Sequence, residues 1–182
     1  LVGSEMCIRD SNRVNKELDL NFYIMNSHHT VAIGTWEGDK QQSIEYNSSI
    51  AVGIDCPRAK LRVSILLDTI QEYQVRYIFS DEEISEAVNE AGLIIGARGI
   101  AYEGVLQRKP VIVVGEYGFG GLVTPDTLHE QYNNYFRGKI NGIKAEYFSL
   151  ERLEEEIRRG FALTFQELQM MSNQTIRFLH NI

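Results

Sequence analysis

The sequence predicts an α/β fold, in which crossover helices cover a parallel sheet, and three observations support this. Between residues 50 and 114, short apolar runs alternate with segments of helical periodicity, which is typical of parallel strands joined by helices. The runs are apolar at every position rather than at every second one, as expected for strands buried on both faces. The chain has 182 residues, 43% of them hydrophobic, so it can bury a core of ordinary size.

The elements can be assigned in order along the chain. The runs 20–25 and 31–35 predict short leading strands, and the polar residues 37–49 predict a loop. Strands of the main sheet are expected at residues 50–54, 75–79, 93–95 and 110–114. Connecting helices are expected at residues 57–70, 84–91 and 100–108.

Two of these helices have recognisable signals. Pro57 can open the first helix. The inward face of this helix is expected to carry Leu61, Ile65, Leu66 and Ile70. Ser80 and Glu83 form a capping box ahead of the second helix. Its buried face is expected to carry Ile84, Ala87, Val88 and Ala91.

The C-terminal part of the chain predicts a glycine-rich loop followed by helices. The loop is expected at residues 115–121, and either Asp126 or Thr127 can cap the next helix. Ser149 is expected to cap a further helix, and residues 161–179 predict a final amphipathic one. In the Ser149 helix, the expected inward residues are Leu150, Leu153 and Ile157, and the expected ion pairs are Glu154–Arg158 and Glu155–Arg159.

Charge and cysteine content exclude several kinds of function. The chain carries 18 Lys and Arg against 25 Asp and Glu, a net charge of −7, without a basic stripe, so nucleic acid is not expected as a partner. No apolar run approaches the roughly 18 residues of a membrane span, although peripheral contact with a membrane stays open. Cys7 and Cys56 make neither a disulfide framework nor a metal cluster, so we expect a cytoplasmic location and no metal site.

The chain divides into three parts by sequence. Residues 1–11 have neither an initiator Met nor the pattern of a signal peptide, and they resemble a peptide translated from sequencing-adapter DNA. We expect them to be foreign to the gene, with an ordinary disordered tail as the alternative. Residues 12–49 are expected to be leading strands or the remnant of a preceding domain, and residues 50–182 the main domain.

Glycines and cations gather where three predicted strands end. These ends are residues 55–60, 96–99 and 115–121, and the carboxyl ends of parallel strands meet at one edge, where ligands bind. The residues concerned are Arg58, Lys60, Gly96, Arg98, Gly99, Gly118, Gly120 and Gly121. Glycine lets the backbone approach a phosphate, and helix N-termini attract anions. The set therefore predicts a phosphate-bearing ligand, although neither a P-loop nor an intact GxGxxG motif is present and tight turns alone would also use glycine.

No side chain stands out as a catalytic nucleophile or base. No serine lies in a nucleophile elbow, and Cys56 has no evident His partner. Glu103, four residues after Gly99, can accept hydrogen bonds from a ribose diol or complement the helix dipole. Spacing alone favours the role at the dipole.

Residues 86–126 read EAVNEAGLIIGARGIAYEGVLQRKPVIVVGEYGFGGLVTPD. This stretch resembles the donor-binding, C-terminal half of GT-B-fold glycosyltransferases, which is a Rossmann-like domain. The shared parts are a strand ending in Gly, a Glu on the next helix, a Lys-Pro-Val-Ile turn and a Gly-Leu-Val-x-Pro-Asp segment. They correspond to residues 93–96, 103–104, 108–112 and 121–126. Residues 134–139 are similar to an Asn-Phe-x-Gly-Arg element of some bacterial members.

The resemblance implies roles for particular residues. Glu103 would bind the donor ribose. The residues placed near the diphosphate would be Arg58, Lys60, Arg98, Gly99 and Ile100. No resident cofactor is implied, because the nucleotide diphosphate sugar is the donor substrate. Ile95 stands where retaining members often carry a second Glu, so the stereochemistry stays open.

The function implied by the resemblance is transfer of a sugar from a nucleotide diphosphate sugar to a glycan or lipid-linked acceptor, in bacterial surface-polysaccharide synthesis. The acceptor domain, expected to precede this chain, would normally supply any catalytic base, so no catalytic residue is assigned. Two alternatives remain: a nucleotide-sugar epimerase of related fold, and a non-catalytic nucleotide-binding or assembly domain.

Overall fold

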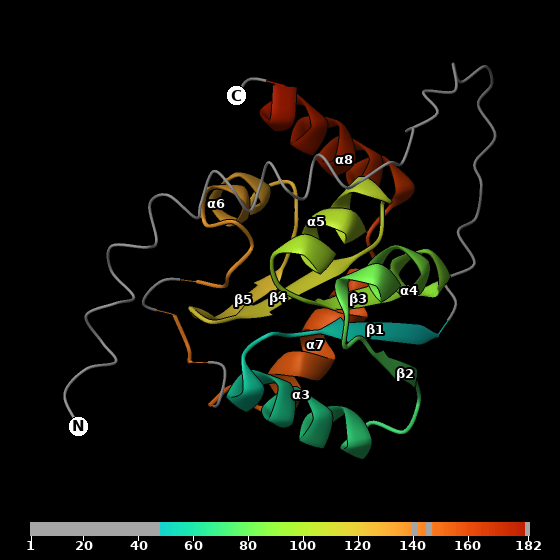
Figure 1. The fold of residues 1–182 in the computed structure, drawn as a ribbon, viewed down its shortest axis with the longest axis vertical. Coiled ribbons are helices and arrows are strands. Elements are labelled where there is room, and N and C mark those ends of the chain that lie inside the picture. The colour runs from blue at the N-terminus through green and yellow to red at the C-terminus, as the bar shows by residue number, and fades with distance from the viewer. Residues whose placement is uncertain (1–47, 140–141, 145–146, 181–182) are drawn as a thin grey trace. The chain divides into compact units, whose positions relative to one another are not determined.

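The computed structural model describes residues 48–139, 142–144 and 147–180. The predicted leading strands, the segment 1–11 and almost all of 12–49 lie outside the described residues. The described residues form a five-stranded sheet with the order β2-β1-β3-β4-β5 (Figure 1). Its strands are β1 (Ser49–Gly53), β2 (Gln74–Tyr77), β3 (Leu93–Gly96), β4 (Val111–Gly115) and β5 (Gly118–Leu122). The first four are mutually parallel and β5 is antiparallel to β4, which confirms the predicted Rossmann-like α/β class.

Helices cover both faces of this sheet. The crossover helices are α3 (Pro57–Thr69), α4 (Ile84–Glu90, after a 3-10 turn at Asp81–Glu83) and α5 (Gly99–Leu106). They are followed by α6 (Leu128–Asn133), α7 (Leu150–Phe161) and α8 (Phe165–His180). Figure 1 shows α3 and α7 on one side of the sheet and α4, α5 and α8 on the other. Strands β3 and β4 are therefore buried at every position, as their uniformly apolar sequences predict. Within the described part of the chain, none of these helices has the length and apolarity that a bilayer crossing requires.

The buried face of α3 agrees with the predicted one at Leu66 and Ile70 and differs from it at Leu61 and Ile65. The residues of α3 that are buried are Ala59, Val63, Leu66 and Leu67. Leu61 and Ile65 are instead 62% and 51% exposed, so the prediction that they face inward was wrong. Apolar residues stand at helical spacing on both sides of this helix, and only contact with the sheet selects one of them.

The capping box predicted at Ser80 also does not form. The Ser80 side chain makes no capping hydrogen bond, and the Glu83 carboxylate accepts a long hydrogen bond of 3.4 Å from the Phe79 N–H. The 3-10 turn at Asp81–Glu83 separates Ser80 from α4, so the spacing that a capping box needs is lost.

Lys109 ends α4 from a distant position in the sequence. Its ammonium group donates to the carbonyl oxygens of Asn89 at 2.9 Å and Ala91 at 2.8 Å, at the C-terminus of that helix. A cation at this place satisfies unpaired carbonyls and complements the helix dipole. Burial lowers the pKa of Lys109. The Lys-Pro turn before β4 therefore has a structural role.

Helix α7 is tied to the sheet by a buried carboxylate. Its predicted cap is confirmed, because the Ser149 hydroxyl accepts from the Arg152 N–H at 3.2 Å. The ion pairs differ from the predicted ones. Those observed are Arg152–Glu155, Arg152–Glu156 and Arg159–Glu156. Glu156 has a side chain only 1% exposed, and it also accepts a hydrogen bond of 3.2 Å from the Leu122 N–H of β5.

We predict that Glu156→Ala lowers the free energy of unfolding by about 2–3 kcal/mol, because hydrogen bonds to a charged acceptor are lost and the Leu122 N–H is left without its partner. The measurement is urea denaturation followed by circular dichroism. Glu155→Ala is the matched control, because its carboxylate pairs with Arg152 at the surface. It should cost about 0.5 kcal/mol or less. Equal losses in the two variants would contradict the structural role of Glu156.

Candidate functional site

The strand order reverses between β1 and β3. From β1 the chain passes through α3 to β2 on one side, and from β2 it returns through α4 to β3 on the other side. Ligands of open α/β sheets bind outside the carboxyl ends of the strands at such a switch point. The site is therefore expected beyond Gly53 and Gly96, which are directly paired at the ends of β1 and β3.

The two strand ends approach each other closely under the side chain of Ile100. A Cβ atom at Gly96 would lie 2.5 Å from both the Gly53 carbonyl oxygen and Ile100 Cγ2, so only glycine fits there. Ile100 is 3% exposed, and its side chain fills the space over Gly53 as well. The close approach at Gly96 and the side chain of Ile100 thus serve packing, whereas the Ile100 backbone belongs to the first turn of α5.

Arg98 connects β3 to α5 with an unusual backbone conformation. Its φ of 54° and ψ of −125° lie in a region that residues with a side chain rarely adopt. Such a conformation costs about 1–3 kcal/mol and persists only where surrounding contacts hold it. The Arg98 N–H donates to the Phe136 carbonyl oxygen at 3.1 Å, and the Ala97 N–H donates to that of Gly53 at 3.3 Å.

The first turn of α5 presents backbone donors to this edge. In the described part of the chain, no side chain caps α5. The amides of its first turn, which include those of Gly99 and Ile100, have no intrahelical acceptor. Together with the helix dipole, they make the N-terminus of α5 suited to an anion.

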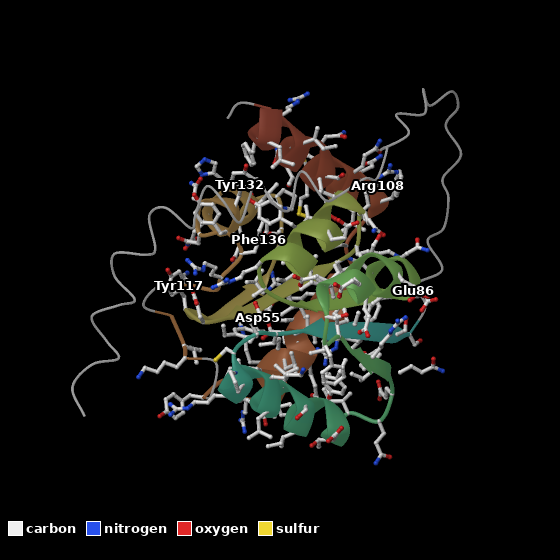
Figure 2. All side chains as sticks on the ribbon, in the orientation of Figure 1. Asp55, Glu86, Arg108, Tyr117, Tyr132 and Phe136 are labelled. Carbon is white, nitrogen blue, oxygen red and sulfur yellow. The ribbon has the colours of Figure 1, made fainter. Side chains whose placement is uncertain are left out.

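A cluster of two arginines and one glutamate lies at the same edge. Glu116, in the turn between β4 and β5, lies 3.1 Å from Arg98 Nη2 through Oε2 and 2.5 Å from Arg137 Nε through Oε1. The Tyr117 hydroxyl accepts a long hydrogen bond of 3.4 Å from Arg137 Nη1. In Figure 2, Asp55 and Tyr117 lie toward this end of the sheet, whereas Glu86 lies on the opposite side.

Sequence reasoning identified Arg98 but missed Glu116 and Arg137. Glu116 directly follows a strand end that had been singled out for its glycines alone. Arg137 belongs to the segment 134–139, far from both strand ends in the sequence. A charged residue next to a strand end, as Glu116 is, was the one local signal that could have identified it; Arg137 has no such local signal.

Glu103 lies on α5, one turn beyond Gly99, and is 8% exposed. Its Oε1 accepts a hydrogen bond from Gln107 Nε2 at 2.6 Å. This hydrogen bond orients a buried carboxylate on the helix that starts at the switch point. The ribose role of Glu103 stays a prediction.

Arg58 and Lys60 occupy the start of α3, after the half-buried free thiol of Cys56. Arg58 is exposed in the first turn. Lys60 is turned toward the end of β2, since its Nζ lies 4.0 Å from the centroid of the Phe79 ring. The sheet order places β2 and β3 on opposite sides of β1, so Lys60 is directed away from the Arg98 cluster.

The glycine-rich residues 115–121 form a hairpin rather than the predicted loop. Gly115 pairs with Gly118, and β5 then runs antiparallel to β4. Gly118 remains at the ligand edge with a φ of 111°, and a side chain there would meet the Ile143 carbonyl. Gly120 lies against the Gln131 side chain and Gly121 against Glu156, farther along β5. The structure therefore gives these three glycines a role in packing and pairing, and the expectation of a loop is wrong, while their part in ligand binding stays a prediction.

Comparisons with known proteins add no family assignment. No protein-family model matches the chain, and a search of curated proteins finds no match. Among the described residues, no three His, Cys, Asp or Glu side chains gather in a way that could hold a metal ion. The geometry at the strand ends therefore carries the functional inference.

We predict that Arg98→Gly is more stable than Arg98→Ala by about 1 kcal/mol. Both variants lose the guanidinium group, but only glycine adopts a positive φ without strain. The greater entropy of glycine in the unfolded chain offsets part of this gain in stability. Urea denaturation of the two variants side by side measures the difference. Equal stability would show that the backbone at residue 98 is not strained.

Proposed function

We propose that this domain binds the nucleoside diphosphate part of a nucleotide sugar beyond the ends of β1 and β3, as the donor-binding domain of a GT-B-type glycosyltransferase. The observation that carries the proposal is the meeting of an uncapped helix N-terminus and two arginines at a topological switch point. A diphosphate needs both kinds of group, because backbone N–H donors and guanidinium forks each bind phosphate oxygens.

The neighbouring residues suit the rest of such a ligand. The buried carboxylate of Glu103 can accept hydrogen bonds from a ribose diol, and Gln107 holds it in place. A charged acceptor makes stronger bonds to hydroxyl groups than a neutral one does. The resemblance of residues 86–126 to donor-binding domains supports the same ligand.

The chemistry open to this site is stabilisation of a leaving group. In sugar transfer, the bond between the anomeric carbon and the diphosphate oxygen breaks, and negative charge develops on the departing diphosphate. Arg98, Arg137 and the amides of α5 stabilise that charge. A base that activates the acceptor is not assigned to any residue of this domain.

We predict that Glu103→Gln lowers the affinity for UDP or GDP at least about tenfold, because charge-assisted bonds of roughly 1.5–3 kcal/mol are lost. Arg98→Ala should weaken the nucleoside diphosphate more than the free nucleoside, because its partner is phosphate. Isothermal titration calorimetry with UDP, GDP, uridine and guanosine measures both effects.

Glu86→Gln is the matched control, since its exposed carboxylate pairs with Arg76 away from this edge of the sheet and should leave binding unchanged. Thermal melts of all variants check that the fold is kept. If the wild-type domain binds neither nucleotide, or if Glu103→Gln and Arg98→Ala bind as the wild type does, the proposed function is wrong.

A further inference from the structure

We infer that Glu116 is an internal counterion that occupies the phosphate position between Arg98 and Arg137, and that an incoming diphosphate displaces it. For the nucleotide, this inference rests on the proposed function; for inorganic pyrophosphate, it stands on the cluster alone. Arg137 then becomes a second phosphate-binding residue. Glu116 pairs with both guanidinium groups in the absence of ligand, and its carboxylate competes with the incoming phosphate.

The geometry of the cluster resembles a bound phosphate group. One carboxylate meets two guanidinium groups from distant segments, and each of its oxygens faces a different arginine. A phosphate presents several oxygens around one centre and makes the same pairings with more charge. Arginine is favoured in such places because its planar fork matches both carboxylate and phosphate.

The backbones of the two arginines are held at the edge independently of Glu116. The backbone of Arg137 is fixed to the hairpin, since its carbonyl oxygen accepts from the Tyr117 N–H at 3.0 Å. The preceding residue, Phe136, is fully buried, and its carbonyl oxygen accepts from the Arg98 N–H. Tyr135 and Phe136 both have positive φ values, of 55° and 51°, so the backbone before Arg137 takes a conformation that surrounding contacts must hold.

Glu116 is the member of the cluster that can leave. It lies in the hairpin turn, and its side chain is 39% exposed, against 12% for Arg137 and 41% for Arg98. Arg98 and Glu116 are thus equally exposed, but Glu116 is the one member whose charge an incoming phosphate can replace. Rotation about its own side-chain bonds takes the carboxylate into solvent without moving the backbone. The cluster carries two positive charges against one negative, so a net attraction for anions remains even in a chain of net charge −7.

The test is calorimetric titration of the wild type and of variants at Glu116 and Arg137 with inorganic pyrophosphate, UDP and GDP. Glu116→Gln keeps the shape of the side chain but removes the competing charge, so it should bind pyrophosphate about threefold or more tighter than the wild type. Arg137→Gln should bind it at least about tenfold weaker. Arg137→Lys keeps the charge but loses the fork, and its affinity should fall between those of Arg137→Gln and the wild type.

The control pair is Arg76 and Glu86, which form an exposed ion pair with an N–O distance of 3.1 Å away from this edge. Glu86→Gln changes the net charge of the protein by the same amount as Glu116→Gln does, and Arg76→Gln changes it as Arg137→Gln does. Neither control variant should change pyrophosphate binding, which would show that the effect of Glu116→Gln is not due to net charge alone. Thermal melts establish that each variant is folded. If Arg137→Gln unfolds, Arg137→Lys and Glu116→Gln still decide the outcome.

Failure of this inference is distinguishable from failure of the proposed function. If UDP or GDP binds but Glu116→Gln binds pyrophosphate no tighter than the wild type, or Arg137→Lys binds as the wild type does, the inference is overturned and the function stands. If pyrophosphate follows the expected order of variants but UDP and GDP bind no tighter than pyrophosphate, the inference stands and the nucleotide proposal falls. Absence of pyrophosphate binding in the wild type and in Glu116→Gln alike overturns the inference.

Discussion

The pairing of Gly53 with Gly96 at the ends of β1 and β3 is the contact on which the rest of the site depends. Because neither residue has a side chain, Ile100 can settle over both, and α5 can start directly at the sheet edge. Arg98 lies in that short connection with a positive φ, and its guanidinium group pairs with Glu116 at the end of β4. A larger residue at Gly96 would collide with the Gly53 carbonyl, so this arrangement constrains the backbone and the charge together.

Two glutamates with similar partners differ in burial, and we infer different roles for them from this difference. Glu156 and Glu116 each meet two arginines, but Glu156 is almost fully buried and also accepts the Leu122 N–H of β5. Removing such a carboxylate leaves a backbone donor unpaired, so its role is to hold α7 on the sheet. Glu116 is partly exposed in a hairpin turn and its partners are anchored elsewhere, so its removal leaves arginines that remain in place for a ligand.

The strands of the sheet were predictable, while several side-chain faces were not. Uniformly apolar runs such as 93–95 and 110–114 become buried central strands in any α/β sheet with helices on both faces. The inward face of α3 was mistaken because Leu61 and Ile65 have the same helical spacing as the residues that are buried. The position of Arg98 at a strand end was predicted from the sequence. Its proximity to Glu116 and Arg137 was not, because these residues belong to other segments and no local pattern shows that the segments meet.

The sequence by itself determined the α/β class, the places where strands end, and the presence of a cation beside glycines at one of those ends. Hydrophobic periodicity and glycine positions are local properties, and they are sufficient for these conclusions. Tertiary structure decided the direction of β5, the packing role of Gly120 and Gly121, and the choice of carboxylate that meets Arg98. Each of these depends on contacts between segments far apart in the chain. Strand pairing, close packing and charge pairing contribute to the energy only after those segments have come together.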